Sequence, residues 1–215
     1  MRVDAKICGL TRPEDAALAV QLGAWRLGVI FAGGPRVVAP SRAREIVAAA
    51  SGTPVLGVFG SESFRTMLEV IRSAGLAGAQ LHGAQPPEVA QQLRSEGLEV
   101  WRVVAIDDAT DLELTLRPAM ADVDAVLLEA RAPGGAGGKG IRIPMAVARQ
   151  ARDHAAGVRV VLAGGLTPDS VEEAIQVVRP DAVDVSSGVE SSPGIKDHDR
   201  LARFLEIVRA TRSTD

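Results

Sequence analysis

Short apolar runs, many of them β-branched, alternate along the chain with longer stretches rich in alanine, leucine, glutamate and arginine. The short runs predict strands, because strands buried on both faces of a sheet are nearly continuous in apolar residues. In the longer stretches apolar residues recur at helical spacing until a glycine or proline, which predicts helices. The predicted strands cover residues 2–8, 26–31, 54–59, 78–82, 99–106, 124–129, 159–164 and 182–187.

Several predicted helices have recognisable ends. Residues 11–14, Thr-Arg-Pro-Glu, predict a helix start with Thr11 as the N-cap, and Gly23 predicts its end. Residues 167–170, Thr-Pro-Asp-Ser, predict a second start. Further starts are predicted at Pro40 and Pro87, and further ends at Gly75 and Gly97.

Strict alternation of strands and helices predicts a parallel sheet, because each helix returns the chain to the same end of the sheet. Eight such units in 215 residues favour a small closed (β/α)8 barrel. A doubly wound open sheet is the alternative, although eight strands are many for it. No linker or shift in composition divides the sequence, so we expect residues 1–215 to form a single domain.

Composition narrows the possible partners and the compartment. With 24 basic against 27 acidic residues, 3% aromatic residues and no tyrosine, the chain lacks the means to bind nucleic acid. Its one cysteine, Cys8, allows no internal disulfide and no multi-cysteine metal site, and no other metal cluster is evident. No segment resembles a signal peptide or a membrane span. We therefore expect a cytoplasmic protein that binds no metal, nucleic acid or membrane.

In a barrel of this kind the active site lies where the strands end. Cys8 ends the first predicted strand and Glu129 ends the sixth, so a thiol and a carboxyl face the same mouth from opposite sides. This placement suggests a base–acid pair. The alternative is that Cys8 is a small buried apolar residue. His82 is a further candidate proton carrier, or a structural histidine.

Glycines follow the last two predicted strands. Gly164 and Gly165 end the seventh, and Ser187 and Gly188 end the eighth. Backbone N–H groups at such ends, with a serine hydroxyl, bind phosphate without a basic side chain. The alternative is that these residues only form tight turns.

The segment 133–140 is the richest in glycine and matches G-x-G-x-x-G at Gly135, Gly137 and Gly140. A dinucleotide site would need an acid about 20 residues further on, and none supports it. A P-loop would need Ser or Thr after Lys139, where Gly140 stands. A lid over the site, within residues 130–143, is the favoured interpretation, and a plain flexible connection is the alternative.

Motifs along nearly the whole chain resemble, in order, those of the phosphoribosylanthranilate isomerases of tryptophan biosynthesis. The resemblance rests on residues 6–12 (KICGLTR), 57–59 (GVF), 80–83 (QLHG), 162–168 (LAGGLTP), 183–190 (VDVSSGVE) and 193–197 (PGIKD).

The resemblance implies a (β/α)8 barrel without a cofactor and a phosphosugar–anthranilate substrate. Such enzymes convert N-(5-phosphoribosyl)anthranilate into 1-(2-carboxyphenylamino)-1-deoxyribulose 5-phosphate, an Amadori rearrangement by acid–base catalysis. The family's base falls on Cys8 and its acid on Glu129, while its carboxylate-binding arginine matches Arg36. Its strand-eight aspartate matches Asp184, and its phosphate-binding residues match Gly164, Gly165, Ser187 and Gly188.

Three positions depart from the family's pattern. Glu129 stands where the family has aspartate, and the extra methylene displaces the carboxyl by about one bond length, on a scale at which ~1 Å can cost ~10²-fold in rate. Gly34 replaces the serine of Ser-Pro-Arg. Residues 140–143 lack the aromatic and acidic residues that normally end the lid.

Other hypotheses stay open beside an active isomerase. An indole-glycerol-phosphate synthase would need a lysine inside the barrel, for which Lys6 and Lys139 look poorly placed. An epimerase would need metal ligands, and a histidine-pathway isomerase a second phosphate site. A paralogue that binds a phosphorylated ligand without catalysis fits the departures at the acid and lid. No apolar surface stripe is evident, which favours a monomer and leaves a dimer possible.

Overall fold

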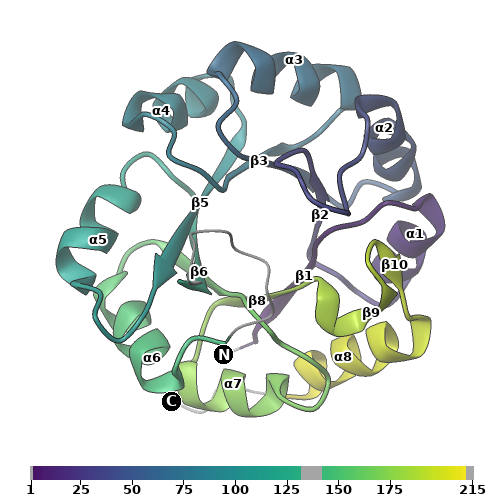
Figure 1. Ribbon diagram of the computed structural model, residues 1–215. Helices are drawn as coiled ribbons and strands as arrows, with labels where there is room; N and C mark the ends of the chain where they lie inside the picture. The colour runs from purple at the N-terminus through teal and green to yellow at the C-terminus, as the bar shows by residue number, and fades with distance from the viewer. Residues whose placement is uncertain (1, 132–141, 212–215) are drawn as a thin grey trace.

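Eight parallel strands pair in chain order and close on themselves through β1 and β8, with helices around the outside (Figure 1). The computed structural model describes residues 2–131 and 142–211. The predicted (β/α)8 barrel is confirmed, and the open-sheet alternative is wrong. The strands are β1 (Asp4–Ile7), β2 (Arg26–Ile30), β3 (Val55–Phe59), β4 (Gly78–Leu81), β5 (Glu99–Ile106), β6 (Ala125–Ala130), β7 (Arg159–Leu162) and β8 (Ala182–Val185).

The helices fill the outer layer and alternate with the strands. They are α1 (Pro13–Gln21), α2 (Pro40–Ala49), α3 (Phe64–Ala74), α4 (Pro87–Ser95), α5 (Leu112–Ala119), α6 (Met145–His154), α7 (Val171–Val178) and α8 (His198–Ala210). None of the helices in the described ranges is long and apolar enough to cross a membrane.

The strand predictions hold to within two residues at either end, and Glu99–Ile106 is reproduced in full. The seventh and eighth strands stop two residues earlier than predicted, because the chain leaves the sheet there to form loops at the mouth. A short helix, η1 (Ser187–Val189), and a hairpin, β9 (Glu190–Ser192) with β10 (Ile195–Lys196), follow β8 and were not predicted. Runs of two or three residues are too short to show a period.

Helix ends follow local chemistry, with one correction. The side chains of Ser63, Asp111 and Asp197 accept N-cap hydrogen bonds at the starts of α3, α5 and α8. The prediction that Thr11 caps α1 is wrong. The N-cap residue is Arg12, without a side-chain cap, and the Thr11 hydroxyl instead donates to the carbonyl of Gly194 in the β9–β10 hairpin.

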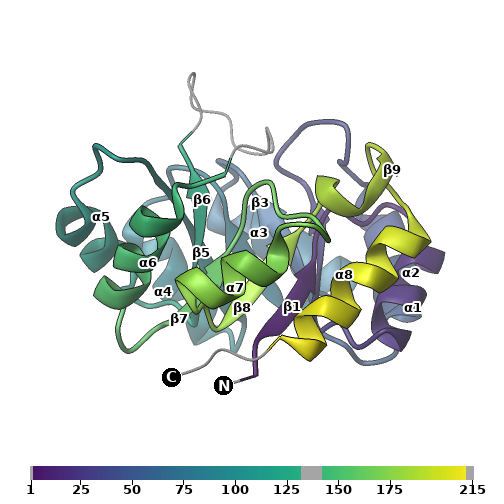
Figure 2. The same cartoon turned by 90° about the horizontal axis from the view of Figure 1, so that it is seen from below.

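Alternation along each strand sorts residues between the barrel interior and the helices. On β6, Ala125 and Leu127 belong to the inner apolar cluster with Trp101, so Glu129 also points inward, at the mouth. On β1 the same alternation turns Lys6 inward. The side view in Figure 2 shows the β9–β10 hairpin at the end of the barrel opposite the start of β1.

Gly78 is a position where the barrel wall leaves no room for a side chain. It pairs with Glu99 on β5, and a Cβ on Gly78 would lie 1.9 Å from the Glu99 carbonyl oxygen. We expect Gly78→Ala to lower the free energy of unfolding by about 1–3 kcal/mol or more, because the two strands must separate locally. Urea denaturation would measure this. Gly60→Ala is the control, because its Cβ would come no closer than 3.4 Å to Ala32. Equal stability of both variants would contradict the expectation.

Candidate active site

One cavity opens at the carboxyl ends of the strands, and all eight predicted site residues line it. The sequence placed them on five different segments, and the barrel brings them together. The cavity is lined by Cys8, Ile30, Arg36, Val58, Gln80, His82, Leu127, Glu129, Ala163, Gly164, Gly165, Leu166, Asp184, Ser186, Ser187 and Gly188.

Cys8 follows β1 and is 5% exposed. Gly28 on β2 makes room for it, because a Cβ there would lie 2.9 Å from the Cys8 sulfur and 3.1 Å from Lys6 Nζ. Burial raises the pKa of the Cys8 thiol, and the negative charge of Asp184 adds to this. The positive charge of Lys6 opposes both effects. The base candidate thus sits beside an ammonium that favours its thiolate.

Lys6 corrects an expectation from the sequence, in which it looked poorly placed inside the barrel. Its side chain is fully buried, and Nζ donates to Asp184 Oδ1 at 2.6 Å. The ammonium also lies 5.6 Å from the centre of the Trp101 ring. The alternation of β1 explains the placement, because Lys6 and Cys8 are two residues apart and face the same side. The barrel therefore has an interior lysine, held as an ion pair.

Glu129 and His82 meet at the mouth of the barrel. His82 Nε2 lies 2.9 Å from Glu129 Oε1, and their side chains are 30% and 13% exposed. The hydrogen bond with Glu129 raises the pKa of His82, against the effect of burial. His82 therefore contacts the acid candidate directly, and both interpretations of it, proton carrier and structural histidine, stay open.

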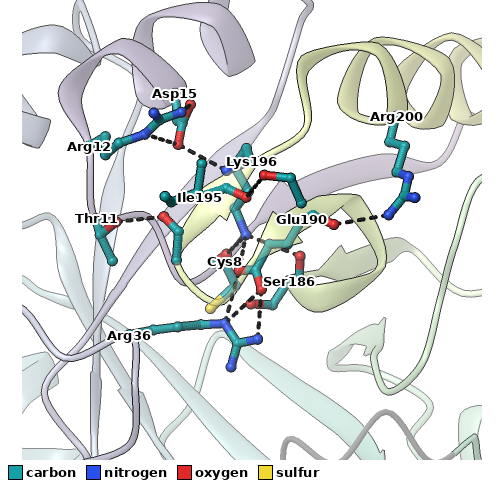
Figure 3. Close-up of polar contacts among 12 residues, drawn as sticks. Cys8, Thr11, Arg12, Asp15, Arg36, Ser186, Glu190, Ile195, Lys196 and Arg200 are labelled. Carbon is teal, nitrogen blue, oxygen red and sulfur yellow. Dashed lines mark hydrogen bonds and ion pairs between the residues drawn. The ribbon is translucent and has the colours of Figure 1, made fainter.

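Arg36 lies in the loop after β2 and faces Glu190, the first residue of β9 (Figure 3). Its Nε donates to Glu190 Oε1 at 2.9 Å, and its Nη2 donates to Oε2 at 2.6 Å. Its side chain passes close over Gly9, whose Cβ would lie 2.7 Å from Arg36 Cδ. No hydrogen bond involves Arg36 Nη1 in the described part of the chain. One edge of the guanidinium is thus fixed, and the other is available to an anion.

Lys196 lies beneath this pair and is fully buried at Nζ. Its ammonium donates to Glu190 Oε1 at 2.9 Å, to the Cys8 carbonyl at 2.7 Å and to the Ser186 carbonyl at 3.1 Å. Burial lowers the pKa of Lys196, although the charge of Glu190 opposes this. Burial alone would raise the pKa of Glu190, but Arg36 and Lys196 outweigh it and lower that pKa. Figure 3 shows these contacts converging on Lys196.

Lys6, Glu190 and Lys196 were not among the predicted site residues. Glu190 and Lys196 stood inside recognised motifs, but nothing marked them as partners of Arg36. The available signal was a pair of opposite charges on either side of Pro193-Gly194, next to a strand end. That arrangement is typical of a hairpin that brings the two charges together.

The glycine-rich loops that follow β7 and β8 form another part of the cavity wall. Gly164 and Gly165 both have left-handed backbone, with φ of +90° and +64°. Within the described residues, their N–H groups make no hydrogen bond. A Cβ on Gly188 would lie 1.8 Å from the Leu166 carbonyl oxygen, so the two loops pack backbone to backbone. Free N–H groups in such a bend are suited to an anion.

The predictions of no metal site and of a lid can be compared with the structure only within the described residues. No group of three or more His, Cys, Asp and Glu that could hold a metal occurs in residues 2–131 and 142–211. The glycine-rich segment 133–140, and with it most of the predicted lid, lies outside the described residues. The lid stays a prediction.

A closed barrel with a thiol, a carboxyl–imidazole pair and glycine N–H groups around one cavity defines a (β/α)8 enzyme of the acid–base class. The family model described as N-(5'phosphoribosyl)anthranilate (PRA) isomerase matches residues 5–207. The chain belongs to this family, and it is an isomerase of tryptophan biosynthesis.

Individual relatives match this chain over nearly its full length. The N-(5'-phosphoribosyl)anthranilate isomerase of Trichlorobacter lovleyi is 40% identical over 207 residues, covering 94% of this chain and 96% of the relative. The crystal structure of the isomerase from Thermotoga maritima has a TM-score of 0.86 at 36% identity, covering 97% of this chain and 99% of that one. A further structure of such an isomerase, in complex with reduced 1-(o-carboxyphenylamino)-1-deoxyribulose 5-phosphate, has a TM-score of 0.83 at 34% identity and covers 97% and 99%.

Lys6 and Asp184 have opposite effects on the thiol, which allows a graded test. We expect Lys6→Met to raise the pKa of Cys8, because the nearest positive charge is lost. The double variant Lys6→Met, Asp184→Asn should raise it less, and Asp184→Asn alone should lower it. Cys8 is the only cysteine, so thiolate absorbance against pH reports on this group alone. The same titration midpoint in all four proteins would contradict the electrostatic coupling.

Proposed function

We propose that this site carries out the Amadori rearrangement of N-(5'-phosphoribosyl)anthranilate, with Cys8 as general base and Glu129 as general acid. The observation that carries the assignment is that the thiol and the carboxyl line one cavity from opposite sides, β1 and β6. The ring of a small phosphosugar fits between two such groups, each of which then reaches a different atom of it.

Ring opening is the acid-catalysed step. Glu129 gives a proton to the furanose ring oxygen as the bond between that oxygen and C1′ breaks, and the electron pair of the bond stays on the oxygen. The lone pair of the anthranilate nitrogen forms a double bond to C1′, which leaves a protonated Schiff base. The acid is 13% exposed, so water competes little for its proton.

Proton abstraction is the base-catalysed step. The Cys8 thiolate takes the proton from C2′, and the freed electron pair forms a double bond between C1′ and C2′ and neutralises the nitrogen. The resulting enolamine gains a proton at C1′ and loses one from the C2′ hydroxyl, which gives the ketone. Lys6, close to the sulfur beside Gly28, supports the thiolate that this step needs.

Different groups of residues bind the two ends of the substrate. Arg36 presents its free edge to the anthranilate carboxylate, while Gly164, Gly165, Ser187 and Gly188 bind the phosphate through backbone N–H groups and a hydroxyl. Asp184, near the sugar in the lining of the cavity, accepts from a hydroxyl with the oxygen that Lys6 leaves free. Among the described residues, Gln80 Oε1 and Ser186 Oγ are buried without a partner, and both residues line the cavity. Substrate hydroxyls satisfy these atoms.

The proposal also covers the compartment, the oligomeric state and the partners of the chain. We place the chain in the cytoplasm as a monomer that takes this small molecule as its partner and binds neither nucleic acid nor membrane. Large apolar side chains exposed among the described residues are scattered over four separate segments, at Val37, Leu114, Val177 and Ile195. Isolated residues of this kind do not make an interface. A relative from Thermotoga maritima is described as dimeric.

Removal of either catalytic group tests the assignment. We expect Cys8→Ala and Glu129→Gln each to lower kcat by about 10²- to 10⁴-fold, because each removes one proton-transfer partner. Steady-state kinetics on N-(5'-phosphoribosyl)anthranilate measures the loss. Calorimetric binding of the reduced product analogue is the control, and it should persist in both variants. Turnover close to that of the unmodified chain in either variant would contradict its role.

Arg36 is tested through the group that it binds. We expect Arg36→Met to raise KM by about 10- to 100-fold with a smaller loss in kcat, because a charge-assisted contact of about 1.5–3 kcal/mol is lost. The same substitution should matter little for N-(5'-phosphoribosyl)aniline, which lacks the carboxylate. An equal rise in KM for both substrates would assign Arg36 a structural role instead.

A further inference from the structure

The acid of this site lies in direct contact with an imidazole. Glu129 comes from β6, and its carboxylate lies 2.9 Å from His82 Nε2, which follows β4. The strand between them, β5, contributes Ala105 at the level of Glu129, so no polar side chain on its inner face separates the pair. Glu129 stands where the family has aspartate, whose carboxyl is one methylene shorter.

The position of His82 is built into the barrel. Its backbone N–H donates to the Phe59 carbonyl at 2.8 Å. The next residue, Gly83, packs so closely on the neighbouring loop that a Cβ would lie 2.3 Å from the Gly60 carbonyl oxygen. The turn that carries the imidazole is thus fixed against β3, and the ring points into the cavity that Glu129 lines.

Among the described residues, charged or titratable groups face the imidazole from three strands. Glu129 faces it from β6, Asp184 from β8, and Lys6 with Cys8 from β1. β3 contributes the apolar Val58 to the cavity wall. Glu129 is the one within ion-pair distance, 2.9 Å, and with Asp184 it raises the pKa of His82, while burial and Lys6 oppose the rise. Opposite charges at this distance stabilise each other strongly in a partly buried site.

We infer that His82 and Glu129 act as a unit that stores one proton: His82 carries it in the resting enzyme and passes it through Glu129 to the ring oxygen. The bond from Nε2 to hydrogen breaks as the Glu129 O–H bond forms. That proton then moves to the ring oxygen as the bond to C1′ breaks. His82 ends neutral and Glu129 ends as a carboxylate, and the pair regains a proton when the enol becomes the ketone. His82 is a positioning residue here, and this role rests on the proposed function of Glu129.

Nuclear magnetic resonance tests the resting state without turnover. The chain has three histidines, and loss of one signal in His82→Asn assigns His82. We expect its titration midpoint to lie above that of an ordinary imidazole and to fall in Glu129→Gln and in Glu129→Asp, because each weakens the contact. His154 and His198 are internal controls, bonded to the Gln150 carbonyl and to Asp15, and should not move. A His82 midpoint unchanged by Glu129→Gln would overturn the inference.

Kinetics tests the coupling. We expect His82→Asn to lower kcat by about 10- to 100-fold with little change in KM. As pH rises, kcat of this variant should also begin to fall at a lower pH than in the unmodified chain, because a carboxyl alone loses its proton at lower pH than an imidazole. The raised pKa of His82 keeps the proton in the unmodified pair to higher pH. His82→Asn should cost less in the Glu129→Asp background than in the unmodified chain.

The outcomes separate the two proposals. Normal kcat and pH profile in His82→Asn, with turnover lost in Glu129→Gln, would overturn the role of His82 and leave Glu129 as the acid. Retained turnover in Glu129→Gln would overturn the acid assignment itself. A change in KM alone in His82→Asn would make His82 a substrate contact and would also overturn its role in proton storage.

Discussion

The buried ammonium of Lys196 is the contact on which the mouth of the barrel depends. It joins three segments that the sequence separates: the end of β1 through the Cys8 carbonyl, the end of β8 through the Ser186 carbonyl, and the hairpin through Glu190. Removing an ammonium from water costs several kcal/mol unless its donors are satisfied, and here all three have acceptors. Because Glu190 also holds Arg36, one charge fixes the base and the carboxylate-binding group relative to each other.

The hairpin is anchored from the opposite side as well. Asp15 on α1 accepts from the backbone N–H of Lys196 at 3.1 Å and from Arg12 at 2.6 Å, and these contacts lower its pKa despite burial. The Thr11 hydroxyl holds the Gly194 carbonyl. The first loop and the last hairpin of the chain therefore form one polar assembly where the barrel closes. The close approach of Arg36 to Gly9 extends it to the second loop.

The sequence was sufficient for the barrel and for placing Cys8 and Glu129 at strand ends, because both depend on local patterns. The assignments of Arg36 and Asp184 came from the family resemblance instead. Apolar runs followed by helical periods predict the strands, and strand ends place Cys8 and Glu129 at one mouth.

The sequence was insufficient for contacts between distant charges. Whether Lys6 faces inward depends on the register of β1, and a shift of one residue would turn it to the other face. The pairs Arg36–Glu190 and His82–Glu129 span 154 and 47 positions, respectively, so no local pattern reveals them. Thr11 shows the same limit, since a good capping residue is used for a distant contact.

The arrangement of charge explains how a chain with a net charge of −3 handles a substrate that carries both a carboxylate and a phosphate. Three cations at the cavity share two carboxylates: Lys6 pairs with Asp184, and Arg36 and Lys196 both pair with Glu190, which leaves one positive charge over. Binding therefore depends on oriented donors, the free edge of Arg36 and the backbone N–H groups of the glycine loops, more than on net charge. At Cys8 burial outweighs the positive charge of Lys6 and raises the pKa of the thiol. Catalysis requires a thiolate at Cys8 together with a proton on the His82–Glu129 pair. Separate charges favour the two states, because Lys6 favours the thiolate and Glu129 favours the proton on His82.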